Sequence, residues 1–202
     1  MGIGVMVLGE SGTGKSTSLR NFLPEEVSII NVEGKPFPFK SSFQRVVNTD
    51  NATKITNLLR QTKSKIVVID DAQYIMANEF MRRSGERGFD KFTEIGVNFF
   101  NVIDVVKTLP SDTIVYFLMH TEETSTGAVK AKTIGKMLDE KISIEGKFSI
   151  VLKTKVQDGK YYFSTQNSGY DTVKTPMGMF KQVLIDNDLK AVDTIIRKYY
   201  GL

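Results

Sequence analysis

The amino-acid sequence predicts an α/β protein with a mainly parallel β-sheet flanked by helices. Up to residue 119, short apolar runs rich in β-branched residues alternate with segments whose apolar residues have helical spacing, the pattern of parallel strands joined by helices. Near the C-terminus, Asp158-Gly159 separates two β-rich runs and predicts a β-hairpin. We expect residues 1–202 to form one domain, because no linker, repeat or low-complexity tract divides them.

The first part of the chain contains most of the expected strands and helices. Strands are expected at residues 3–8, 27–32, 45–47, 66–69 and 113–119. Helices are expected at residues 15–22, 51–61, 72–81 and 92–109. Asp50 or Asn51 is available to cap the second of these helices, and Pro24 and Pro110 would end the first and the last, because proline cannot continue a helical hydrogen-bond ladder.

The remaining segments differ in composition. Residues 122–141 are polar and contain two glycines, so we expect a loop with one short helix. Residues 148–156 and 161–165 are the expected strands of the hairpin. The segment from about residue 179 to residue 199 is expected to be helical.

The composition excludes several kinds of site. The chain has no cysteine, which excludes disulfides and thiolate metal sites, and its single histidine excludes a multi-histidine metal centre. No apolar run approaches about 18 residues, and no basic leader precedes the first one, so we expect no membrane span and a cytoplasmic protein. The net charge of +4 suits a polyanionic partner and equally an ordinary solvated surface.

Residues 9–16 read Gly-Glu-Ser-Gly-Thr-Gly-Lys-Ser, a complete phosphate-binding loop between an expected strand and an expected helix. The glycines would allow backbone N–H groups to turn toward the phosphates of a nucleoside triphosphate. Lys15 would reach the β- and γ-phosphates, and Ser16 would supply a hydroxyl ligand to Mg²⁺. The residues expected to bind the nucleotide are Gly9, Glu10, Ser11, Gly12, Thr13, Gly14, Lys15, Ser16 and Thr17.

Two carboxylates follow the expected strand at residues 66–69. Asp70 is placed to hold Mg²⁺ through its water ligands, and the alternative is a polar residue that caps the strand end or a helix. Asp71 either caps the helix that begins at Ala72 or helps to polarise water.

Glu33 and His120 follow two other strands, so they are expected at the same edge of the sheet as the phosphate loop. Glu33 could orient the water that attacks the γ-phosphate or accept its proton, and otherwise it is a turn residue before Gly34. His120 could hydrogen-bond the γ-phosphate or that water, and otherwise it is a structural histidine.

Two basic segments suit the phosphate backbone of single-stranded nucleic acid, with Phe89 or Phe92 as stacking platforms. The alternative is a solvated surface, because acidic residues lie among the basic ones. The candidate cations are Arg82, Arg83, Arg87 and Lys91 in the first segment and Lys130, Lys132 and Lys136 in the second.

The phosphate loop, Glu33, Asp70, His120 and the late hairpin together resemble the core of RecA-like P-loop ATPases. More narrowly, nearly the whole chain is similar to small bacteriophage ATP-binding proteins of the RecA-like single-strand annealing type. This resemblance implies ATP and Mg²⁺ as ligands, Glu33 as the catalytic glutamate and His120 as the γ-phosphate sensor. It also implies that the two basic segments are DNA-binding loops, and that Lys174 can act on the nucleotide of a neighbouring subunit, although a plain surface lysine is the alternative.

The function implied by the resemblance is an ATP-hydrolysing DNA-recombination protein that binds single-stranded DNA and promotes annealing or pairing. Such a protein would be a homo-oligomer with ATP at the subunit interface, with a single-strand binding protein as a further partner, and would act in the host cytoplasm if a phage encodes it. An AAA-type DNA-remodelling or initiation ATPase is the alternative, because residues 69–73 resemble some initiator ATPases. A small-molecule or nucleotide kinase, and a nucleotide-regulated interaction module with negligible turnover, also remain open.

Overall fold

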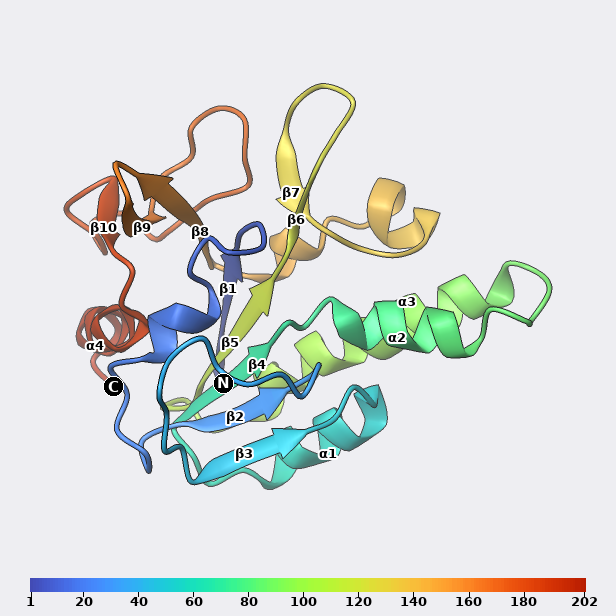
Figure 1. Ribbon diagram of the computed structural model, residues 1–202, viewed down its shortest axis with the longest axis horizontal. Coiled ribbons are helices and arrows are strands. Elements are labelled where there is room, and N and C mark those ends of the chain that lie inside the picture. The colour runs from blue at the N-terminus through green and yellow to red at the C-terminus, as the bar shows by residue number, and fades with distance from the viewer.

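One β-sheet of eight strands organises the protein, which a computed structural model describes over residues 1–202 apart from the side chain of Asp139. The spatial order of the strands is β10-β9-β8-β1-β5-β4-β2-β3, and a separate ribbon pairs β6 with β7 (Figure 1). The bounds are β1 Ile3–Leu8, β2 Ser28–Asn31, β3 Arg45–Asn48, β4 Ile66–Asp70, β5 Ile114–Met119, β6 Thr121–Glu123, β7 Val129–Ala131, β8 Ile150–Gln157, β9 Lys160–Ser164 and β10 Leu184–Asp186.

The six strands from β8 to β3 are parallel, and β9 runs antiparallel to both of its neighbours, β8 and β10. The predicted α/β class with a mainly parallel sheet is therefore confirmed. β5 lies between β1 and β4, so that Met119 pairs with Leu8 on one side and Phe117 pairs with Ile69 on the other. The carboxyl ends of these three strands consequently meet at one edge of the sheet.

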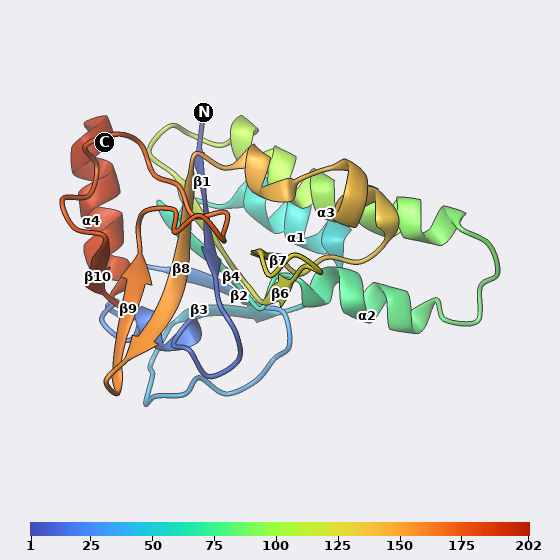
Figure 2. The ribbon, with the colours of Figure 1, turned by 90° about the horizontal axis from the view of Figure 1, so that it is seen from above.

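Helices cover both faces of the sheet, because alternate residues of the central strands point to opposite sides. On one side Met6 and Leu8 of β1 pack with α1, α2 and α3, and on the other Val5 and Val7 pack with α4 and the segment after the phosphate loop (Figure 2). The helices are α1 Ala52–Gln61, α2 Tyr74–Arg82, α3 Asp90–Asp104 and α4 Leu189–Tyr200.

The helix predicted at residues 15–22 is wrong in its type and length. The segment forms only a 3₁₀ turn at Ser16–Leu19, followed by further tight turns. Ser18 Oγ donates a hydrogen bond to the carbonyl oxygen of Lys15 at 2.6 Å. Serine and threonine side chains compete in this way for the hydrogen-bond partners of the backbone. The sequence Ser-Thr-Ser at residues 16–18 therefore disfavours a long helix.

The C-terminal predictions are partly confirmed. The hairpin pairs β8 with β9 around Asp158 and Gly159, whose φ angles of 52° and 70° belong to a tight two-residue turn. The helix predicted from about residue 179 is wrong in its first part, because residues 184–186 pair with β9 as β10 and α4 begins only at Leu189. The side chain of Asp188 accepts hydrogen bonds from the backbone N–H groups of Lys190 and Ala191, and this N-cap fixes where α4 starts.

Two other segments extend the architecture. Residues 122–141, predicted as a loop with one short helix, contain most of the β6–β7 ribbon and a π-helical turn at Met137–Lys141. α2 and α3 form a long arm that projects beyond the sheet and ends in the loop of residues 83–89 (Figure 1). Among the described residues, none of the helices combines the length and apolar character needed to cross a membrane.

Candidate nucleotide-binding site

Residues 9–16 form a tight loop at the carboxyl end of β1. Gly12 and Gly14 have φ angles of 76° and 97°, in the left-handed region that glycine reaches at little cost. Gly9 packs so closely against β8 that a β-carbon there would collide with Thr154 Oγ1. Thr154 Oγ1 also lies 2.6 Å from Thr13 Oγ1. The loop is therefore fixed to β8 as well as to its own strand.

Lys15 is buried within this loop. Its Nζ donates hydrogen bonds to the carbonyl oxygens of Gly9 and Glu10, each at 2.9 Å. Burial lowers the pKa of Lys15, an effect that the carboxylates of Asp71 and Asp70 partly oppose. The ammonium group is thus positioned among loop oxygens, where it can form charge-assisted hydrogen bonds to phosphate.

Ser16 and Asp70 come together although 54 residues separate them in the chain. Ser16 Oγ donates a hydrogen bond to Asp70 Oδ1 at 2.9 Å. Burial, together with the charge of Asp71, raises the pKa of Asp70 to about 6. A hydroxyl and a carboxylate placed side by side fit a hard cation such as Mg²⁺, which prefers oxygen ligands and keeps several waters.

Asp71 connects β4 with the neighbouring strand ends. Its φ of 60° is uncommon for a residue other than glycine, and such conformations are often found at functional sites. Oδ1 of Asp71 is 3.3 Å from His120 Nε2, and Oδ2 is 3.7 Å from Lys35 Nζ. Burial would raise the pKa of Asp71, but the hydrogen bond and charge of His120 and the charge of Lys35 hold it below its usual range.

His120 links this cluster to the β6–β7 ribbon. Its backbone N–H donates to Gln73 Oε1 at 3.1 Å, and its carbonyl oxygen accepts a hydrogen bond from the N–H of Lys132 at 2.9 Å. The ring of Tyr74 meets the imidazole edge-on at 6.0 Å between centroids. A displacement of the His120 backbone would therefore disturb its hydrogen bond with the N–H of Lys132.

Glu33 contacts Asn78 and Lys35 and does not line the cleft that contains the other two carboxylates. Its Oε1 accepts a hydrogen bond from Asn78 Nδ2 of α2 at 2.8 Å, and its Oε2 is 3.6 Å from Lys35 Nζ. Lys35 therefore bridges Glu33 and Asp71. Glu33 and Asp71 thus share one ion-pair partner. The catalytic role of Glu33 stays a prediction.

A cleft of about 430 Å³ joins these residues at the carboxyl edge of the sheet. The predicted residues that line it are Ser11, Gly12, Gly14, Lys15, Ser16, Thr17, Asp70, Asp71 and His120. The other predicted residues do not line the cleft. The carbonyl oxygens of Gly9 and Glu10 accept hydrogen bonds from Lys15, and Thr13 contacts Thr154 of β8. Glu33 is also outside the lining.

Sequence patterns missed several residues of the cleft wall. They are Asn31, Lys35, Pro36, Pro38, Tyr74 and Tyr161. Lys35 could have been found from its place in the loop directly after Glu33, at the same sheet edge. Nothing local marks Tyr161, which the β8–β9 hairpin brings to within 3.0 Å of the position that a β-carbon on Gly14 would take.

The arm contains two predicted nucleic-acid-binding cations that are bound within the fold. Arg83 forms ion pairs with three carboxylates at 2.6 to 3.2 Å, those of Glu79, Glu86 and Glu94. Lys91 is buried, and its Nζ donates to the carbonyl oxygens of Arg83 and Glu86. Phe92, one of the two predicted stacking platforms, packs against Phe80 at 5.4 Å between ring centroids. These side chains hold the end of the arm together.

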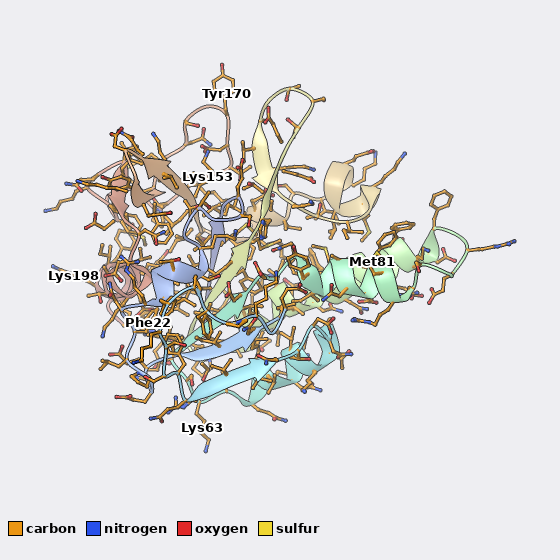
Figure 3. All side chains as sticks on the ribbon, viewed as in Figure 1. Phe22, Lys63, Met81, Lys153, Tyr170 and Lys198 are labelled. Carbon is orange, nitrogen blue, oxygen red and sulfur yellow. The ribbon has the colours of Figure 1, made fainter. Side chains whose placement is uncertain are left out.

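The other residues of the arm are more accessible. Arg82 pairs with Asp50 at 2.5 Å on the surface. Arg87 is exposed and, within the described part of the chain, forms no ion pair. Phe89 is 86% exposed, and Met81 of α2 is also exposed (Figure 3). Arg87 and Phe89 are thus the arm residues best placed to meet a partner.

The second basic segment surrounds the β6–β7 ribbon. Lys130 pairs with Glu122 across the ribbon at 3.0 Å. Lys132 and Lys136 are exposed, and no ion pair of either is found among the described side chains. Lys174 is exposed as well. Its backbone pairs with Val151 of β8 and it does not line the cleft of its own chain, so its action on a neighbouring subunit stays a prediction.

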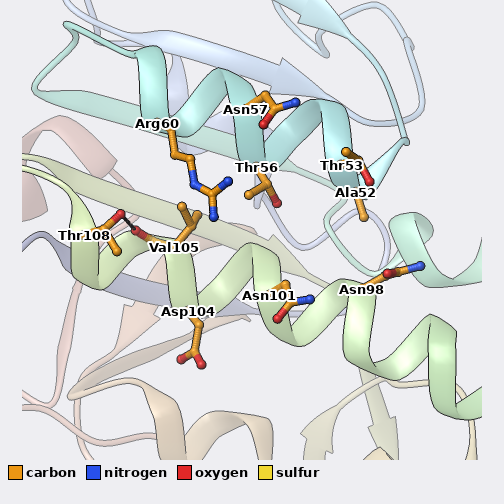
Figure 4. A pocket seen from close by; sticks show the side chains of 10 residues that line it. All are labelled: Ala52, Thr53, Thr56, Asn57, Arg60, Asn98, Asn101, Asp104, Val105 and Thr108. Carbon is orange, nitrogen blue, oxygen red and sulfur yellow. Dashed lines mark hydrogen bonds between the residues drawn. The ribbon is translucent and has the colours of Figure 1, made fainter.

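A second hollow of about 430 Å³ lies between α1 and α3. Its wall is mostly threonine and asparagine, and Figure 4 shows the guanidinium group of Arg60 extending from α1 toward α3. None of the predicted site residues lines it. Its lining residues come from α1, α3 and the 3₁₀ turn that follows α3.

The cleft beside β1 can therefore bind phosphate oxygens through Lys15 and the loop N–H groups, and a hard cation through Ser16 and Asp70. His120 and Lys35 lie within the same wall. Comparisons with known proteins assign no family, since no protein-family model matches the chain and no curated protein matches it significantly.

Proposed function

We propose that the protein is an Mg²⁺-dependent, RecA-like P-loop ATPase that binds single-stranded DNA and promotes its annealing or pairing. The observation that supports the nucleotide chemistry best is the Ser16 Oγ–Asp70 Oδ1 hydrogen bond of 2.9 Å beside the buried ammonium group of Lys15. A glycine-rich loop, a hydroxyl and a strand-end carboxylate in one cleft form a site for a metal-bound triphosphate.

Each residue has a defined task in this proposal. Lys15 and the loop N–H groups bind and orient the phosphates. Ser16 and, through water, Asp70 would hold Mg²⁺, which when bound would neutralise negative charge on the phosphate oxygens. Glu33 orients the attacking water or accepts its proton, and His120 contacts the terminal phosphate or that water.

The DNA part of the proposal rests on exposed cations near the same edge. Lys132 donates its backbone N–H to His120, which provides a path between the phosphate site and the ribbon. Lys132, Lys136 and Arg87 can contact the phosphate backbone, and Phe89 offers a ring for base stacking. The AAA-type alternative receives less support, because residues 150–200 form a hairpin, a short strand and one helix rather than a helical lid.

The test measures ATP binding and ATP hydrolysis with and without single-stranded DNA. We expect Lys15→Ala to abolish ATP binding, since the buried ammonium is lost, and Glu33→Gln to retain binding but lose turnover, since a neutral amide cannot accept the proton. Lys63→Ala is a matched control, because this exposed lysine precedes β4 and so lies at the opposite end of that strand from Asp70 (Figure 3).

Three outcomes would contradict the proposal in different parts. If the parent protein does not bind ATP, the nucleotide role is wrong. If Glu33→Gln hydrolyses ATP at the parent rate, Glu33 is not the catalytic glutamate. If single-stranded DNA changes neither hydrolysis nor oligomeric state, the DNA role fails while the ATPase remains.

A further inference from the structure

Lys35 is a second lysine of the nucleotide cleft, and its backbone is held firmly in place. It follows Gly34, whose φ of 65° turns the chain at the end of β2. The buried amide of Asn31 fixes this turn from both ends, because Oδ1 accepts the N–H of Gly34 at 2.9 Å and Nδ2 donates to the carbonyl oxygen of Lys35 at 2.7 Å. The backbone that carries the Lys35 side chain is therefore held in one conformation by Asn31.

The side chain of Lys35, in contrast, is held loosely. It is 59% exposed, and its Nζ is 3.6 Å from Glu33 Oε2 and 3.7 Å from Asp71 Oδ2, beyond the range of good hydrogen bonds. Exposed ion pairs of this length contribute little to stability. The ring of Tyr74, with its centroid 5.1 Å from Nζ, supports the ammonium group from one side.

The charges of the cleft indicate what would draw this side chain in. Lys15 and Lys35 are the lysines in its wall, facing the carboxylates of Asp70 and Asp71, and Lys15 is already hydrogen-bonded to loop oxygens. The terminal phosphate of a triphosphate adds negative charge that a diphosphate lacks. An ammonium group forms shorter and stronger bonds to phosphate oxygens than the long ion pairs that Lys35 makes here.

We propose that Lys35 binds the terminal phosphate and thereby allows the protein to distinguish a nucleoside triphosphate from a diphosphate. This inference rests on the proposed nucleotide-binding function. When Nζ turns to the phosphate it gives up only its long ion pairs with Glu33 and Asp71, and Glu33 keeps its hydrogen bond from Asn78.

A purely structural role makes a different prediction. If Lys35 served only to tie Glu33 to Asp71, its loss would alter the binding of both nucleotides to the same extent. If it contacts the terminal phosphate, only the triphosphate is affected. The ratio of the two affinities therefore separates the roles.

The experiment measures the dissociation constants of ATP and ADP, each with Mg²⁺, by titration calorimetry. We expect Lys35→Met, which keeps the apolar stem, to weaken ATP binding about tenfold or more while ADP binding changes by less than about twofold. Lys35→Arg keeps the charge and should retain most of the preference for ATP. Lys63→Met removes one charge at the other end of β4 and should leave both constants unchanged.

The failures are distinguishable. If the parent binds neither nucleotide, the proposed function falls and this inference falls with it. If the parent prefers ATP and Lys35→Met retains that preference, or loses ATP and ADP binding equally, the nucleotide site stands and the role of Lys35 is wrong. Circular dichroism of the variants ensures that the comparison is made between folded proteins.

Discussion

Asp70 is a carboxylate that the fold keeps almost entirely from water. Burial and the charge of Asp71 raise its pKa to about 6, although the hydrogen bond from Ser16 and the charge of Lys15 act in the opposite direction. At neutral pH the folded protein therefore contains a buried negative charge that is only partly compensated. Such a group weakens the fold and is suited to a bound cation.

This burial predicts a pH dependence of stability in metal-free buffer. The folded-state pKa lies above the unfolded value of 3.8, so between these values the folded protein holds more protons, and stability falls as pH rises through about 4 to 6. The cost at pH 7.5 is about 3 kcal/mol. We expect Asp70→Asn to be more stable than the parent at pH 7.5 and close to it at pH 4. Urea denaturation with EDTA present measures this, and an equal difference at both pH values would contradict it.

For single residues, the sequence predicts a role in the site when the neighbouring residues in the chain indicate that role. The phosphate loop is recognisable because its glycines and Lys15 follow each other in the chain. Asp70 was predicted from its position after an apolar run. Lys35 and Asn78 were not, because their significance lies in contacts with Glu33 that only the folded chain creates.

The β8–β9 hairpin is the element that completes the cleft. It contributes Thr154 to the back of the phosphate loop and Tyr161 to its front. Both depend on the two-residue turn at Asp158 and Gly159, which fixes the pairing of Gln157 with Lys160. The position of these side chains therefore follows from the register of the hairpin.

Substitutions in the turn test this dependence. Gly159→Val places a β-branched residue at a φ of 70° and should lower the free energy of unfolding by about 1–2 kcal/mol. Asp158→Asn, at a φ of 52°, should change it little, because asparagine tolerates this conformation. Chemical denaturation of both variants measures the difference, and equal stability of the two would show that the turn does not constrain the fold.

Elements were predicted well where one signal dominates and poorly where signals compete. The hairpin was predicted because Asp-Gly demands a specific turn. The helix at residues 15–22 was wrong because Ser18 hydrogen-bonds to its own backbone segment, and the helix from residue 179 was wrong in its first part because pairing with β9 outweighs helical spacing. Strand pairing between distant segments leaves no local trace in the sequence.

In the whole molecule, the arm of α2 and α3 and the β6–β7 ribbon both extend from the sheet (Figure 1). Both structures present exposed cations, but the arm also contains cations that are bound internally. Arg83 is held by three carboxylates, whereas Arg87 forms no ion pair among the described residues. Two arginines four positions apart thus have different surroundings, which the composition and net charge of the segment do not distinguish.

This difference predicts opposite phenotypes for two arginine variants. We expect Arg87→Ala to weaken single-stranded DNA binding and to reduce the slope of log affinity against log salt by about 0.7, the value for one phosphate contact. Lys132→Ala and Lys136→Ala should behave in the same way. Arg83→Ala should instead lower the melting temperature, because three carboxylates lose their common partner, and leave the salt slope unchanged.

Fluorescence anisotropy of a labelled oligonucleotide over a range of salt concentrations measures the slope, and thermal denaturation measures the stability. Unchanged affinity and slope in all three of Arg87→Ala, Lys132→Ala and Lys136→Ala would falsify the DNA-binding role of these segments. A reduced slope in Arg83→Ala would show that its ion pairs open to bind DNA.

The central position of β1 has a consequence for synthesis of the protein. β1 precedes both of its partner strands in the chain, because it pairs on one side with residues 114–119 and on the other with residues 150–153. During translation the phosphate loop therefore has no complete sheet behind it until β8 has left the ribosome. We expect a nascent chain that ends before residue 150 to expose an unpaired edge of β1 and to bind no nucleotide, so the loop becomes functional only after segments that lie more than a hundred residues later.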